Sequence, residues 1–179
     1  LSITMDADKN ITANFVEIPP PPPDSFNLTI GIDGNGSTDP GEGTHRYQEG
    51  DQVTITATAD NGWRFDGWTG DVPEEDWSSN PLSITMDADK NITANFVEMF
   101  TLTLRKKGEG STSPAVGEHT YTKGTKVEIE AKPDTKNGWT FGGWTGDYPE
   151  EEWSENPIIV TMDEDKDITA NFVQGNSNY

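Results

Sequence analysis

The sequence predicts an all-β protein made of small antiparallel β modules in tandem, each a sandwich or open barrel of about five to six short strands. Three observations support this prediction. Short segments alternate apolar and polar residues with a period of two, which is typical of half-buried strands. Turn-forming sequences rich in Gly, Asn and Asp separate these segments. Finally, a block of about 73–75 residues occurs twice, and repetition at such a period indicates an array of one structural unit.

The repeats define the expected domains. Residues 1–17 and 82–98 share the sequence LSITMDADKNITANFVE, and residues 158–174 are a diverged third copy. We therefore expect five segments: the C-terminal hairpin of a preceding repeat (1–17), a polyproline linker (18–25), two full modules (26–98 and 100–174) and a tail (175–179). Five consecutive prolines form a semi-rigid rod. Only Met99 separates the two full modules, so we expect them to abut.

Four segments of the first module place their apolar residues on one face: FNLTIGI, QVTITATA, LSITM and NITANF. The turn at 87–90 is expected to join the last two as a tight hairpin. Gly67-Trp68 interrupts the alternation of Trp63 and Phe65, which indicates a β-bulge. The segment from Pro73 to Trp77 is compatible with a single helical turn.

The aromatic residues of the strand motifs are expected to supply most of the core. We expect these side chains and their counterparts in the second module to be buried: Trp63, Phe65, Ile84, Phe96, Trp139, Phe141, Val160 and Phe172. The first two tryptophans of each module lie in the strand motif and are assigned to the core as well.

The composition excludes several classes of partner. The chain has 12 Lys+Arg against 32 Asp+Glu, a net charge of −20, and this disfavours nucleic acid and anionic membrane surfaces. No run approaches the roughly 18 apolar residues that span a bilayer, so no membrane insertion is expected. The chain lacks cysteine, which is compatible with secretion without disulfides.

No residue group indicates catalysis. His45 and His119 occupy equivalent positions, one in each module, and neither has a Cys or a second His at ligand spacing. Acidic pairs such as Glu74/Glu75 resemble a glycosidase dyad only in composition, since adjacent loop carboxylates are usually solvated. We therefore expect no enzyme activity.

Three acidic segments, at 6–10, 87–91 and 163–167, start like a calcium loop but lack its downstream glycine and glutamate, and each contains a lysine. Because strands flank them, we favour turns, expect no cofactor, and keep calcium as the alternative. The candidate ligands are Asp87, Asp89, Asn91, Asp163, Asp165 and Asp167.

Trp77 and Trp153 follow charged residues outside the strand motif. Exposed rings at these positions would bind a glycan or a protein partner. The interpretation that we favour is a plug that closes one end of each module.

Two sets of residues are candidates for assembly. The apolar row of residues 1–16 has no module of its own to cover it, and an isolated hairpin is marginal in water. Upstream strands of a longer parent protein would complete it, which is the explanation that we favour, and the alternative is strand addition to another copy. The basic patch on the first strand of the second module is expected to face an acidic surface of a neighbouring module or chain, and the alternative is that its residues are ordinary solvated charges. These residues are Ile3, Met5, Ile11, Ala13 and Phe15 in the row, and Arg105, Lys106 and Lys107 in the patch.

The combined motifs resemble the divergent internalin B-repeat domains of bacterial and archaeal surface proteins. They are Tyr-x-x-Gly-x-x-Val-x-Ile-x-Ala from Tyr47, Gly-Trp-x-Phe-x-Gly-Trp-x-Gly-Asp from Gly62, Asn80-Pro81, and the segment from Thr85 to Phe96. The resemblance implies a small β-rich fold, with a β-grasp-like relative. It also implies a non-catalytic extracellular or cell-surface repeat.

As its function we expect a structural stalk, spacer or filament subunit that contacts copies of itself or other repeats of the same protein. The alternative is an adhesin or carbohydrate-binding module that uses exposed tryptophans.

Overall fold

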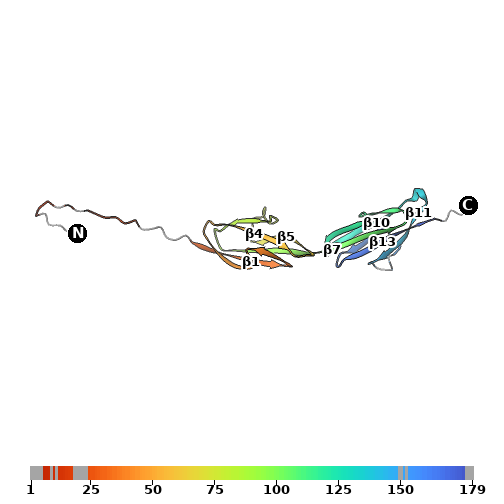
Figure 1. Ribbon diagram of the computed structural model, residues 1–179, viewed down its shortest axis with the longest axis horizontal. Coiled ribbons are helices and arrows are strands. Elements are labelled where there is room, and N and C mark those ends of the chain that lie inside the picture. The colour runs from red at the N-terminus through yellow and green to blue at the C-terminus, as the bar shows by residue number, and fades with distance from the viewer. Residues whose placement is uncertain are drawn as a thin grey trace.

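The computed structural model describes residues 6–8, 10, 12–17, 24–148, 151 and 153–175. Two β modules lie end to end, and one long strand runs from the first into the second (Figure 1). The strands of the first module are β1 (Ser25–Asp33), β2 (Gly36–Asp39), β3 (Gly43–Gln48), β4 (Gln52–Ala59), β5 (Trp63–Gly70) and β6 (Leu82–Thr85). The shared strand is β7 (Lys90–Lys107), and the second module continues with β8 (Gly110–Ser113), β9 (Gly117–Thr122), β10 (Lys126–Pro133), β11 (Trp139–Gly146), β12 (Ile158–Thr161) and β13 (Lys166–Gln174). A short 3₁₀ turn, η1 (Thr135–Asn137), precedes β11.

Each module is a two-layer sandwich, which confirms the predicted all-β class. In the first module one sheet has the order β5-β7-β1-β3 and the other β2-β4-β6. In the second module the corresponding sheets are β11-β13-β7-β9 and β12-β10-β8. The apolar faces of the strands meet between the layers, as their period of two requires. Twelve buried side chains form each core, including Leu28, Ile55, Trp68, Ile92 and Phe96 in the first module.

The predicted bulge is present in both modules. The register between β5 and β7 shifts between Phe65 and Gly67, and β11 and β13 show the same shift between Phe141 and Gly143. The extra residue turns Trp68 inward, where only 2 % of it is exposed. Its indole N–H donates to the carbonyl of Ser79 at 2.7 Å, which satisfies the one polar group of the buried ring.

The prediction of a tight hairpin at 87–90 is wrong. β6 pairs with β4 in one sheet, whereas β7 pairs with β5 and β1 in the other. The turn therefore passes from one layer of the sandwich to the other. A short turn between two alternating segments can form a hairpin within one sheet or connect the two sheets of a sandwich. Here the two strands lie in different sheets because their apolar faces pack on the same core from opposite sides.

Two further details differ from the expected fold. Each module has seven strand segments rather than five or six, because the short β2 and β8 pair with β4 and β10 although they carry little apolar sequence. In addition, β1 runs parallel to β7. The sequence between them crosses over through the second sheet, and such a crossover permits parallel pairing.

The expected burial is confirmed for Ile84, Phe96 and their counterparts Val160 and Phe172, but not for Trp63 and Phe65, or for Trp139 and Phe141. Those four side chains are only partly buried against the core. Trp63 is the first residue of β5, at the end of the sandwich where the layers no longer cover it fully. The fully buried tryptophans are Trp68 and Trp144, as their place in the motif indicated.

Candidate functional site

The junction between the modules is the most distinctive site of the chain. Strand β7 has no break in its pairing there, because β5 pairs with it as far as Glu98 and β9 begins to pair with it at Met99. The backbone N–H of Met99 also donates to the carbonyl of Gly62 at 2.8 Å. Since neighbouring strands hold consecutive residues of β7, the junction has no unpaired residue to act as a hinge.

An ion pair also joins the two modules. The ammonium group of Lys123 lies 2.8 Å from a carboxylate oxygen of Glu98, and the backbone N–H of Lys123 donates to the carbonyl of Glu98 at 2.9 Å. Both side chains keep contact with water, so the pair is worth at most about 1 kcal/mol. Its effect is to fix the turn after β9 against the end of the first module.

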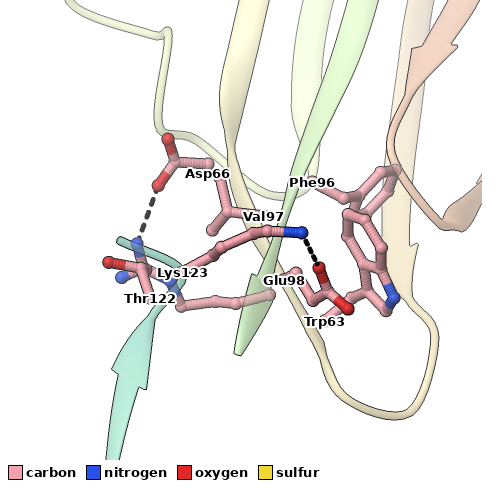
Figure 2. Close-up of a pocket in the computed structure, with 8 residues that line it drawn as sticks. Trp63, Asp66, Phe96, Val97, Glu98, Thr122 and Lys123 are labelled. Carbon is pink, nitrogen blue, oxygen red and sulfur yellow. Dashed lines mark hydrogen bonds and ion pairs between the residues drawn. The ribbon is translucent and has the colours of Figure 1, made fainter. Parts of the chain in front are cut away.

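A shallow hollow of about 370 Å³ lies at this junction (Figure 2). Figure 2 shows Lys123 reaching across it toward Glu98, with Asp66 on the other side. Side chains of both modules line the hollow: Trp63, Arg64, Asp66, Phe96, Val97, Glu98, Thr122 and Lys123. The wall is mixed in polarity and open to water, and it holds no converging set of catalytic groups.

The outer ends of the two modules repeat parts of this junction. At the start of the first module the backbone N–H of Glu49 donates to the carbonyl of Asp24 at 2.7 Å, as Lys123 does to Glu98. At the end of the second module Gly175 donates to the carbonyl of Gly138, as Met99 does to Gly62. The ion pair is not repeated, because Asp24 and Glu49 carry like charges. The junction thus combines a general backbone pattern with one specific charge pair.

The carboxylates proposed for calcium do not converge. Asp89 accepts a hydrogen bond at 2.7 Å from the backbone N–H of Asn27, and Asp165 accepts the equivalent bond from Thr101. Asn91 lies on β7, where its backbone N–H donates to Asp71. Among the described residues no group of three or more His, Cys, Asp or Glu is placed to hold a metal ion.

The remaining candidates of these turns form ion pairs within their own module. Asp87 pairs with Lys90 at 2.6 Å and Asp163 with Lys166 at 2.8 Å. The hydrogen bond from the lysine lowers the pKa of each aspartate, and in return the Asp163 carboxylate raises the pKa of Lys166. Asp167 pairs with Arg105 at 3.0 Å.

A comparison with family models places both modules in one family. The model of the divergent InlB B-repeat domain matches residues 26–99 and again residues 100–176. The chain belongs to the divergent InlB B-repeat family. This confirms the resemblance inferred from the Gly-Trp and Asn-Phe motifs. A search of curated proteins found no match.

Membership of the InlB B-repeat family indicates a repeat region of a surface protein, and the family is not known to be catalytic. The ring Nε2 of His45 is hydrogen-bonded at 2.6 Å to the backbone carbonyl of Gly41, and that of His119 makes the same bond to Ala115. None of the described residues forms a helix long and apolar enough to cross a lipid bilayer.

The basic patch of the second InlB B-repeat has partners inside that repeat. Besides the pair of Arg105 with Asp167, the ammonium group of Lys106 donates to the carbonyl of Gly110 at 3.0 Å and lies 3.5 Å from Glu109. Lys107 ends the shared strand β7. A contact of this patch with an acidic surface of another chain remains a prediction.

The apolar row near the start of the chain is only partly described. Ile3, Met5 and Ile11 lie outside the described residues. Ala13 and Phe15 are exposed, Phe15 to 95 %, and no strand includes them. The identical segment in the first repeat supplies β6 to one sheet and the first half of β7, residues 90–98, to the other. A donated copy would therefore have to enter both layers, and strand donation remains a prediction.

Trp77 and Trp153 lie at equivalent places on the two repeats, each with 53 % of its surface exposed. Trp77 follows β5 in the chain and Trp153 follows β11. In the first repeat the segment from Pro73 forms turns, with the N–H of Asp76 bonded to the carbonyl of Pro73, and no helix is formed there. Sequence reasoning identified both tryptophans but could not place them relative to the bulge.

Proposed function

We propose that the tandem repeats act as a non-catalytic stalk or spacer that holds other parts of a surface protein at a fixed distance. The observation that carries this proposal is the continuous strand β7, which belongs to both sandwiches. Its 18 residues extend for about 60 Å, at a rise of roughly 3.3 Å per residue. A spacer that keeps its length needs such a junction, because a flexible linker would let the two modules fold toward each other.

The arrangement of the chain ends also supports a spacer. The chain enters the first module at one end of the molecule and leaves the second module at the other (Figure 1). Further repeats added in the same way would extend the structure in one direction. The sequence before the first module adds a second kind of connection, the five prolines, which would form a semi-rigid rod.

Pulsed electron–electron spin resonance tests the proposal on the full chain, with one spin label at Thr54 in β4 and one at Glu128 in β10. Both are exposed strand residues, one in the sheet β2-β4-β6 and the other in the sheet β12-β10-β8. A rigid spacer gives one narrow distance distribution. The matched control carries six Gly/Ser residues inserted after Glu98, which should broaden the distribution. If the natural chain and the insertion variant show equally broad distributions, the junction is flexible and the proposal is wrong.

A further inference from the structure

Each module carries a tryptophan that packs against the protein on one side and is exposed to water on the other. Gly67 of the bulge lies directly beneath Trp77, because a Cβ added to Gly67 would lie 2.5 Å from Cε3 of that ring. The carbonyl of Trp77 accepts the backbone N–H of Trp68 at 2.6 Å. Trp153 has the same relation to Gly143 and Trp144. Bulge and tryptophan thus form one unit that both modules retain.

This unit differs from a plug. Covering Gly67 occupies only the inner part of the ring, and 53 % of Trp77 still faces water. The expected plug at an end of the module is therefore not what the structure places here. Gly67 pairs with Asn95 of β7, and because the neighbours Ala94 and Phe96 face the core, the ring lies on the outer face of the sheet. A flat, pre-positioned indole loses little conformational freedom when a ligand stacks on it.

Polar side chains suited to hydroxyl groups lie next to this ring. Arg64 and Asp66 form an ion pair at 2.7 Å, with about half of each side chain exposed. Together with Phe65, Gly67, Trp77 and Ser78 they line a hollow of about 290 Å³. A small number of placed polar groups around an apolar surface is the usual composition of a small-ligand site. The carboxylate accepts hydrogen bonds and the guanidinium donates them.

We propose that the first module binds neutral polysaccharide, with a sugar ring stacked on the outer face of Trp77 and its hydroxyl groups bonded to Asp66 and Arg64. The C–H face of a pyranose matches the apolar surface of the indole. The net charge of −20 disfavours an anionic polymer. This binding is a different property from the spacer role, because Trp77 does not line the junction hollow, although Arg64 and Asp66 line both hollows.

The second module has the equivalent tryptophan, Trp153, but the hollow beside it is formed by other positions, the counterparts of Trp68, Thr69, Gly70 and Val72. Thr140 and Gly142 replace Arg64 and Asp66, so the charged pair is missing. Instead Tyr148 joins Trp153 around a hollow of about 400 Å³. One chain therefore offers two aromatic platforms of different polarity. If both tryptophans bound the same polymer chain, the affinity would increase through multivalency.

Affinity electrophoresis of the full chain tests the proposal, with hydroxyethyl cellulose, galactomannan and glycogen as neutral polysaccharides and polygalacturonate as the anionic one. At least one neutral polymer should retard the chain, and polygalacturonate should not. Trp77→Ala should weaken binding about tenfold, the loss expected for a central aromatic anchor, and the Trp77→Ala/Trp153→Ala double variant should abolish it. Ile159→Ala, which shortens another exposed apolar side chain (61 % exposed), is the matched control and should bind normally.

Two results overturn the proposal: no retardation by any of the three neutral polymers, or unchanged binding by the double variant. Thermal unfolding of each variant shows whether lost binding reflects lost folding. If Trp77→Ala also lowers the melting temperature, Asp66→Ala decides, because it leaves the ring and its glycine in place. Weaker binding by Asp66→Ala at an unchanged melting temperature supports the site, and unchanged binding refutes it.

Discussion

Replacing Phe96 by alanine should cost the first module about 3–5 kcal/mol, the usual loss for a buried aromatic residue. Only 5 % of Phe96 is exposed, and its ring meets that of Phe65 edge to face at 5.8 Å. A module of about 75 residues is stable by roughly 4–11 kcal/mol in total. The substitution therefore removes a large part of the stability of the first module, while the second module keeps its own core.

The close contact between Gly36 and the ring of Phe96 allows a second, more specific test of this prediction. A Cβ added to Gly36 would lie 2.5 Å from Cζ of Phe96 and 2.7 Å from both Cε atoms. Gly36→Ala alone should thus cost about 1–3 kcal/mol, because the ring must shift in a packed core. In the Phe96→Ala background the added methyl group enters the space left by the ring. Its cost there should fall to about 0.5 kcal/mol or less.

Urea unfolding followed by two-dimensional NMR measures this, since amide signals report each module separately. The matched substitution Phe172→Ala should destabilise the second module by a similar amount and spare the first. The reasoning is refuted if Phe96→Ala costs less than about 1 kcal/mol. It is also refuted if the losses of Gly36→Ala and Phe96→Ala add without coupling.

Three further predictions concern the bulge, the acidic turns and the start of the chain. Gly67→Ala should destabilise the first module by about 1–3 kcal/mol, because its φ of +130° and the indole both resist a side chain; Gly50→Ala, at φ +85° in open space, should cost less in the same urea titration. The hydrogen bond from Lys166 lowers the pKa of Asp163 in the folded chain. Ionised Asp163 therefore stabilises the fold at pH values above its pKa in the unfolded chain, and this stabilisation is lost as the pH falls through its pKa in the folded chain. NMR titration should show this low pKa, and Lys166→Met should return it toward its usual range. If residues 1–16 donate a strand to another copy, deleting them should lower the mass measured by light scattering, and equal monomer masses at high concentration would exclude donation.

Alternation of apolar and polar residues was enough to predict the fold class and most strands. The Gly67-Trp68 step also predicted the bulge, because a glycine inside an alternating strand often marks one. It was harder to predict to which of the two sheets of the sandwich each strand belongs. The segments at 82–86 and 91–96 both have one apolar face, and nothing local shows that these faces meet from opposite sheets.

The candidate site was less accessible to sequence reasoning than the fold. The single residue Met99 between the modules predicted that they abut, but the uninterrupted pairing of β7 depends on how far β5 and β9 extend along it. Likewise the ion pair of Glu98 and Lys123 joins residues that are 25 positions apart. Asp66 and Trp77 lie near each other only because the turns after β5 fold back onto the bulge.

The parallel pairing of β1 with β7 has a mechanical consequence for a protein that is pulled at its ends. Tension enters the first module at the start of β1 and leaves it along β7, so the two neighbouring strands are drawn in opposite directions along their length. Six paired positions, from Leu28 with Lys90 to Asp33 with Asn95, then carry the load in shear and at the same time. They cannot open one after another as in a peeled hairpin. β7 and β13 repeat this geometry in the second module, from Leu102 with Lys166 to Lys107 with Asn171, so every repeat in such a chain would resist force in the same way.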